Sequence, residues 1–80
     1  MQVKVLAFAV VKEIFNQSSV EVDLGNASTV GGLKILLEDR YPRLKQLSSY
    51  MIAVNDEYSD AKQVIEARDE IAIIPPVSGG

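Results

Sequence analysis

The sequence predicts an α+β fold in which a mixed sheet of about five strands is covered on one face by one main helix. Two observations carry this prediction. Short segments with strand-like alternation stand before and after one segment with helical spacing. The first and last strand-like segments are also the most apolar, which is typical of strands at the centre of a sheet. With 80 residues, the chain is expected to form a single domain over residues 1–80.

The N-terminal part of the chain is expected to supply two strands and a short helical turn. Residues 3–10 (VKVLAFAV) begin with alternation and then become apolar on both faces. Residues 12–15 are expected to form one helical turn, and Asn16 to end it, because asparagine tolerates left-handed backbone geometry. Residues 20–24 alternate between apolar and acidic side chains, which indicates a strand with one face toward the core. Gly25-Asn26 then breaks this strand.

The main helix is predicted to begin at Val30, with Thr29 as its N-cap. Its apolar residues fall on one side at helical spacing, and they are Val30, Leu33, Leu36, Leu37 and Tyr41. Pro42 is expected to end the helix, because the residue before a proline avoids helical geometry. We interpret Arg40 and its basic neighbours as complements to the helix dipole rather than as a phosphate site.

The C-terminal part is expected to complete the sheet. Residues 50–54 indicate a third strand, and residues 55–57 a turn into a short fourth strand near Tyr58. Residues 70–74 indicate the last strand, which we expect beside the first one at the centre of the sheet. This order of elements is the layout of a β-grasp fold.

Composition argues against several kinds of function. The chain has no cysteine and no histidine, which excludes disulfides and a Ser-His triad and makes most zinc sites impossible. Its net charge of -3 does not favour nucleic-acid binding. No apolar run approaches the roughly 20 residues needed to cross a bilayer, and no signal peptide is recognised, so a cytoplasmic location is expected. Its acidic clusters lack metal-loop spacing, so we interpret them as solvated surface and expect no metal site.

Gly31-Gly32 stands at the start of the predicted helix, where glycine is unfavourable. Backbone N–H groups there could hold an anion, but the flanking sequence has neither a dinucleotide pattern nor a P-loop. Close packing against a partner or against a neighbouring strand would also explain the two glycines. The sequence leaves these explanations open.

The C-terminal sequence IPPVSGG carries the most distinctive pattern, and residues 75–80 are predicted to form an extended functional tail. Pro75 and Pro76 are expected to end the last strand, because proline cannot donate to a ladder and favours an extended chain. Gly79 and Gly80 lack a β-carbon and can thread a narrow channel. The terminal carboxylate of Gly80 is then the only distinctive functional group of the chain.

At this point the chain resembles the small subunit of molybdopterin synthase, one of the ubiquitin-like β-grasp sulfur carriers, over essentially its whole length. The segments that carry the resemblance are residues 3–9, 12–14, 29–30, 53–55, 69–72 and above all 75–80. Two positions depart from the family pattern, which often has glycine where this chain has Ala67-Arg68 and Asn16. We therefore expect a different turn shape near Arg68, with no effect on the tail.

The resemblance implies a sulfur carrier that is not an enzyme on its own and binds no cofactor. A ubiquitin-activating-like adenylyltransferase would use ATP to adenylate Gly80, and a sulfur donor enzyme would convert the adenylate to a thiocarboxylate. The tail would then enter the large subunit of molybdopterin synthase. There the sulfur would attack cyclic pyranopterin monophosphate to build the dithiolene of the molybdenum cofactor. The residues implied to contact partners are Pro75, Pro76, Val77, Ser78 and Gly79, with Phe8 on the sheet face that the helix leaves uncovered.

Three alternatives stay open at this stage. The chain could carry sulfur for thiazole synthesis or tRNA thiolation, it could be a ubiquitin-like modifier that joins Gly80 to lysine, or it could be an interaction module with an inert tail. The sequence also leaves open which activating enzyme acts and whether molybdenum or tungsten is the final metal.

Overall fold

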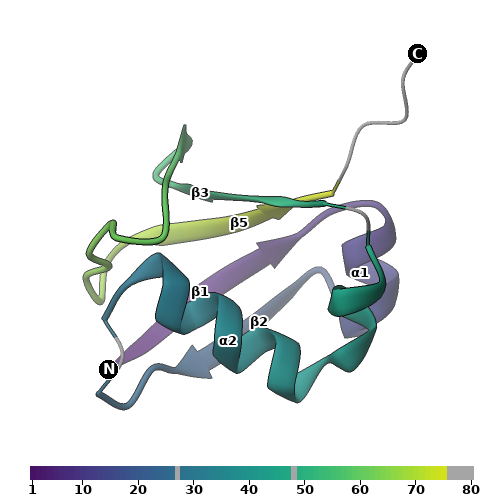
Figure 1. The fold of residues 1–80 in the computed structure, drawn as a ribbon, viewed down its shortest axis with the longest axis horizontal. Coiled ribbons are helices and arrows are strands. Elements are labelled where there is room, and N and C mark those ends of the chain that lie inside the picture. The colour runs from purple at the N-terminus through teal and green to yellow at the C-terminus, as the bar shows by residue number, and fades with distance from the viewer. Residues whose placement is uncertain (27, 48, 76–80) are drawn as a thin grey trace.

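The structure is a computed structural model that describes residues 1–26, 28–47 and 49–75. Within these residues, two helices, a 3-10 helix and five strands follow one another (Figure 1). Their bounds are β1 (Gln2–Ala7), α1 (Val10–Phe15), β2 (Ser19–Asp23), α2 (Val30–Arg40), η1 (Pro42–Gln46), β3 (Met51–Val54), β4 (Glu57–Tyr58) and β5 (Glu70–Ile74).

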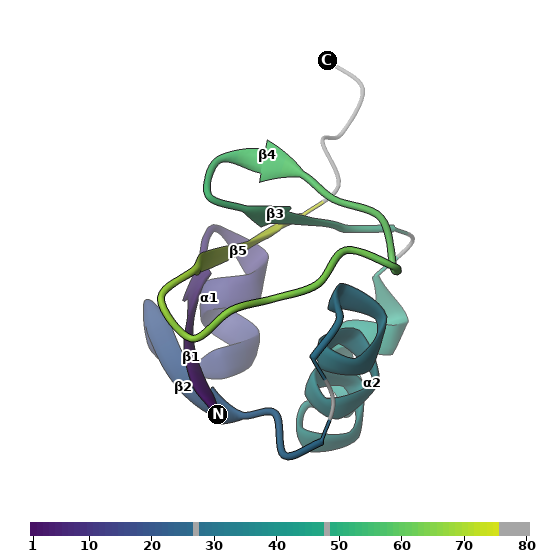
Figure 2. The same cartoon turned by 90° about the vertical axis from the view of Figure 1, so that its left-hand side faces the viewer.

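The strands form one mixed sheet in the order β2-β1-β5-β3-β4. β1 and β5 lie side by side and parallel at its centre, as predicted, and the other pairs are antiparallel. Figure 2 shows α1 and α2 on the same side of the sheet. The predicted α+β layout, with one main helix on one face, is therefore confirmed.

The core fills the space between the sheet and the helices. Alternate residues of the central strands point into it, and Val5, Ile71 and Ile73 are fully buried. The predicted helix face is confirmed, because Val30, Leu33 and Leu37 are buried and Leu36 and Tyr41 pack against them. Since every second strand residue is taken into the core, the intervening residues lie on the opposite face of the sheet.

The first strand ends earlier than the sequence suggested. β1 stops at Ala7, and Val10 is already the first residue of α1. The chain turns at Ala9, which has φ 51° and ψ -126°, a conformation that L-residues rarely adopt. The prediction of a strand through Val10 was wrong because a continuous apolar run does not distinguish a strand from a buried helical turn. Asn16 does end α1 in left-handed geometry, at φ 61°.

The ends of α2 follow the predicted chemistry. The Thr29 hydroxyl oxygen accepts a hydrogen bond from the Gly32 N–H at 3.2 Å, which confirms the N-cap. The helix ends at Arg40, before Pro42, as expected. Pro42 then begins η1, because proline is also well suited to the first turn of a new helix. This 3-10 helix was not predicted from the sequence. No helix among the described residues is long and apolar enough to span a bilayer.

Candidate functional site

The sheet face opposite α1 and α2 is called the open face here, and strand register defines its residues. Leu6 of β1 pairs with Ala72 of β5, Ala72 pairs with Ala53 of β3, and Ala53 pairs with Tyr58 of β4. These four residues form an apolar row across the sheet. Ile74 pairs with Met51 one step nearer to the end of β5.

The other end of the open face is charged. Lys4 of β1 pairs with Glu21 of β2 on one side and with Glu70 of β5 on the other. The face therefore changes from charged to apolar in the direction in which β5 runs. In the apolar part of the face three large side chains are exposed, Phe8 at 48%, Met51 at 49% and Tyr58 at 68%. The charged residues at the other end are exposed as well. Large apolar side chains in contact with solvent at one place mark an interaction surface.

The apolar end of the open face is also the end at which the chain leaves the sheet. β1 and β5 are parallel, and Ala7 pairs with Ile73. Phe8 and Pro75 therefore follow the C-terminal ends of two neighbouring strands. β5 ends at Ile74 directly before Pro75, as predicted, since proline has no N–H for the ladder. Figure 1 shows the end of β5 and the end of β1 on the same side of the molecule.

The structure describes two of the predicted site residues. Phe8 is exposed beside the open face and Pro75 is half-buried at the end of β5. Pro76, Val77, Ser78, Gly79 and Gly80 lie outside the described residues. Their roles therefore stay predictions from the sequence.

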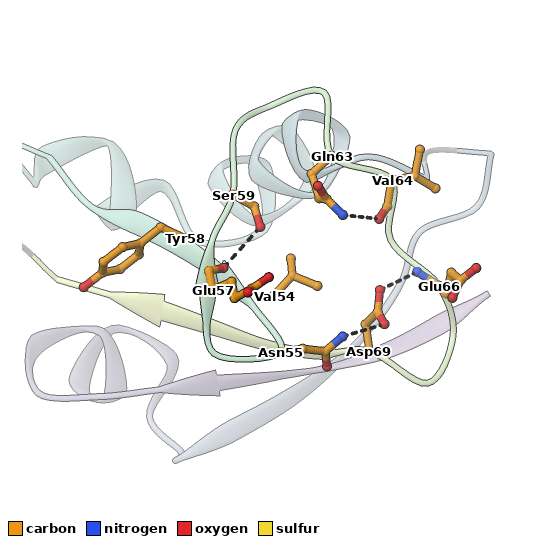
Figure 3. A pocket seen from close by; sticks show the side chains of 9 residues that line it. All are labelled: Val54, Asn55, Glu57, Tyr58, Ser59, Gln63, Val64, Glu66 and Asp69. Carbon is orange, nitrogen blue, oxygen red and sulfur yellow. Dashed lines mark hydrogen bonds between the residues drawn. The ribbon is translucent and has the colours of Figure 1, made fainter.

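The opposite end of β5 is held by a network that the sequence analysis missed (Figure 3). Asn55, at φ 53°, donates from its backbone N–H to the Glu70 carbonyl at 2.8 Å, and its Oδ1 accepts from the Glu70 N–H at 2.9 Å. Its Nδ2 donates to Asp69 Oδ1 at 2.9 Å. Asp69 Oδ2 accepts from the Glu66 N–H at 2.8 Å. These bonds join the β3–β4 turn to the loop before β5.

The same network stabilises the turn at Ala67-Arg68. A turn shape different from that of relatives with glycine was expected here. Neither residue has a positive φ, so the turn needs no left-handed residue there. Asp69 instead closes the turn by binding the Glu66 N–H. That hydrogen bond, followed by the one from Asn55, lowers the pKa of the Asp69 carboxyl below its usual value. Asp69 therefore belongs to a structural network, and among the described residues no group of acidic side chains could hold a metal ion.

The N-terminus of α2 is occupied by the loop between β4 and β5. The Val30 and Gly31 N–H groups donate to the carbonyls of Gln63 and Ala61, both at 2.9 Å. A Cβ on Gly31 would lie 3.1 Å from the Ala61 carbonyl oxygen and 3.2 Å from its Cβ. Close packing against this loop therefore explains Gly31, and these two N–H groups are already used within the chain.

A polar contact joins α2 to the start of β3. The Tyr50 hydroxyl donates to the Glu38 carboxylate, and Lys34 Nζ lies 5.2 Å from the centroid of the Tyr50 ring. Burial, followed by the bond to Glu38 and its charge, raises the pKa of Tyr50 above its usual value. Tyr50 therefore stays protonated at neutral pH, where it holds two elements together and cannot serve as a general base.

The fold and the open face define the class of this protein as a ubiquitin-like β-grasp protein. A solved structure of SAMP1 from Haloferax volcanii superposes with a TM-score of 0.84 and 27% identity, covering 100% of both chains. A model described as the ThiS family matches residues 5–80, and the chain belongs to this family.

Two further proteins match over almost the whole chain. The molybdopterin synthase sulfur carrier subunit of Dictyostelium discoideum is 45% identical over 83 residues, which cover 99% of this chain and 96% of that protein. One chain in the complex of subunits 1 and 2 of molybdopterin-converting factor from Helicobacter pylori is 26% identical, with a TM-score of 0.71 and full coverage of both chains.

Proposed function

We propose that this chain is the sulfur carrier subunit of a molybdopterin synthase. The observation that carries the proposal is the 45% identity, across nearly the whole chain, to a protein of that name. The IPPVSGG terminus agrees with it, because a glycine carboxylate at the end of a narrow tail is the group that such chemistry needs. Because the chain has no cysteine and no histidine, we assign the activation of the Gly80 carboxylate to partner enzymes.

The proposed chemistry takes place at the Gly80 carboxylate. One of its oxygens attacks the α-phosphorus of ATP on an activating enzyme, and pyrophosphate leaves. A sulfide-level sulfur from a donor enzyme then attacks the acyl carbon, so that a C–S bond forms, the C–O bond to AMP breaks, and a thiocarboxylate results. On the large subunit, this sulfur attacks a carbon of the pyranopterin precursor, so that a C–S bond forms while the C–O bond at that carbon breaks and its oxygen departs. Water then cleaves the bond between the acyl carbon and sulfur and regenerates the carboxylate.

The open face supports the proposed partnership with the large subunit. Phe8, Met51 and Tyr58 leave apolar surface in contact with water at the end of the sheet where the tail begins. A partner that takes in the tail must pass this end, and it can bury these side chains as it does so. We propose that the chain itself holds no cofactor, that ATP is bound by the activating partner, and that neither nucleic acid nor a membrane takes part.

Intact mass spectrometry tests the sulfur carrier function directly. The purified chain is incubated with ATP, the activating enzyme and a sulfur source, and then added to the large subunit with the pterin precursor. We expect the mass to rise by the difference between one sulfur and one oxygen and to fall back when precursor is converted. A chain that never gains sulfur, or conversion of the precursor by the isolated chain, would contradict the proposal.

A second candidate function is that of a protein modifier, favoured by the structural match to a small archaeal modifier protein. In that case the Gly80 acyl carbon would join a lysine amine, and AMP would leave. The two functions differ in their products. Adducts linked through lysine in cell extract, without a thiocarboxylate, would support the modifier function instead.

A further inference from the structure

A hollow of about 450 Å³ lies between the end of β1, the start of α1 and the start of β2. Its apolar part is formed by Leu6 and Phe8, and its polar part by Lys4, Lys12, Ser18 and Ser19. None of the residues that line it is acidic. The hollow therefore carries two positive charges in a chain whose net charge is -3.

Topology places this hollow beside the tail. Leu6 pairs with Ser19 at the start of β2, and the next residue, Ala7, pairs with Ile73 near the end of β5. The end of β1, the start of β2 and the end of β5 therefore lie at the same end of the sheet. Leu6 also belongs to the apolar row of the open face, so the hollow continues that surface.

The two lysines are available for a partner. The ion pair found among the described residues joins the Met1 amino group to Asp23, at 3.3 Å, and involves neither Lys4 nor Lys12. Glu21 and Glu70 flank Lys4 in the sheet, yet neither forms an ion pair with it. Both lysines are exposed. Exposed charges that flank an apolar contact set the orientation and association rate of a complex.

The backbone at the rim of the hollow is in a rare conformation. Ala9 lines the hollow and has φ 51°, which is unfavourable for any residue with a Cβ. This corner makes the chain leave β1 and enter α1, with Phe8 before it and Lys12 after it. Both side chains therefore reach the same hollow from different elements.

From these observations we propose that the hollow receives an acidic side chain of the large subunit, an aspartate or glutamate with apolar neighbours. The apolar neighbours would cover Leu6 and Phe8, and the carboxylate would pair with Lys4 and Lys12. This inference rests on the proposed function, because it takes the large subunit as the partner. It adds a charged contact that fixes how the partner is oriented while it accepts the tail.

Charge reversal tests the contact, with the variants Lys4→Glu and Lys12→Glu. Lys45→Glu is the matched control, because it makes the same change on η1, which belongs to the helical side of the fold. All three lysines are exposed, but Lys4→Glu places a third carboxylate between Glu21 and Glu70. Circular dichroism therefore checks that each variant is folded before its binding is measured. Binding to the purified large subunit is measured at ionic strengths of about 0.02 M and about 0.5 M, since salt screens exposed charges.

We expect Lys4→Glu and Lys12→Glu each to weaken binding about tenfold at low salt, mainly through slower association, and less at high salt. Lys45→Glu should change it less than about twofold. Equal affinities for all three variants would overturn the inference while leaving the sulfur carrier function intact. The inference would also be overturned, with the sulfur carrier function intact, if Lys4→Glu and Lys12→Glu slowed only adenylation by the activating enzyme. A wild-type chain that does not bind the large subunit would instead overturn the proposed function.

Discussion

Asn55 Nδ2 donates a hydrogen bond to Asp69 Oδ1 at 2.9 Å, and this bond links the β3–β4 turn to the loop that leads into β5. Asn55 also exchanges two hydrogen bonds with the backbone of Glu70, the first residue of β5. β5 is the strand from which the tail departs. One side chain therefore anchors the end of that strand farthest from the tail.

Replacing Asn55 with alanine should lower the free energy of unfolding by about 1–3 kcal/mol, because two side-chain hydrogen bonds are lost. Asn16→Ala is the matched control. Asn16 has nearly the same left-handed backbone, at φ 61°, and no hydrogen bond of its side chain is found in the part of the chain that the structure describes. Urea unfolding of both variants separates the contribution of the side-chain hydrogen bonds from that of the left-handed backbone. Equal losses would show that backbone geometry alone explains the requirement for asparagine.

Asp69 should make stability depend on pH. Its pKa is lower in the folded chain, so its contribution is present above the unfolded value of about 3.9 and is lost as pH falls through the folded value. Asp69→Asn should therefore destabilise the chain more at neutral pH than below about pH 3. Denaturant unfolding at both pH values measures the difference. If wild type and Asp69→Asn differed by the same free energy of unfolding at both pH values, the charge of Asp69 would contribute nothing to stability.

Ala9→Gly should stabilise the chain. Glycine adopts φ 51° without a steric cost, and relief of this conformation outweighs the greater freedom of glycine in the unfolded state. We expect a gain of about 1 kcal/mol in the free energy of unfolding. Ala67→Gly, at an exposed position without positive φ, should cause a loss. Thermal unfolding compares the two, and a loss for both would mean that Ala9 is not strained.

Tyr50→Phe should remove the hydrogen bond to Glu38 and leave a half-buried carboxylate without that donor. The expected loss is about 1–2 kcal/mol near pH 7. Since the pKa of Tyr50 is raised in the folded chain, its contribution is present below the unfolded value of about 10 and declines as pH rises beyond it. The gap between wild type and variant should therefore narrow in alkaline urea unfolding. A gap that stays constant would contradict this assignment.

Function should depend on Gly80 being the last residue and on Gly79 being small. Adding one residue moves the terminal carboxylate by roughly 3.5 Å, and deleting Gly80 retracts it by a similar distance. Displacements of about 1 Å can cost about a hundredfold in a preorganised site. Gly79→Val should block threading. Each variant is compared with wild type for folding, thiocarboxylate formation and synthase activity. We expect normal folding without sulfur delivery, and full activity in the longer or shorter chain would contradict the carrier mechanism.

Local sequence patterns were sufficient for most of the fold. The alternation of residues 20–24 and 70–74, the Thr29 cap and the stop before Pro42 each depend on neighbours in the chain, so they could be recognised without a structure. The end of β1 could not be recognised in this way. Residues 5–10 form one apolar run, and its division at Ala9 depends on the packing of α1 against β1 and β2.

The candidate site divides along the same line. The glycine pair and the prolines before it could be recognised without a structure, because their properties are local and chemical. Two other features depend on the folded chain. Phe8, Lys4 and Lys12 line one hollow beside the exit of β5, and Asn55 reaches Asp69 and Glu70. The exit of β5 lies beside residues 4–12 because β1 and β5 pair in parallel. Asn55 and Glu70 are 15 residues apart and meet because β3 and β5 pair antiparallel. Pairing between distant strands is set by the burial of a shared core, which no single segment encodes.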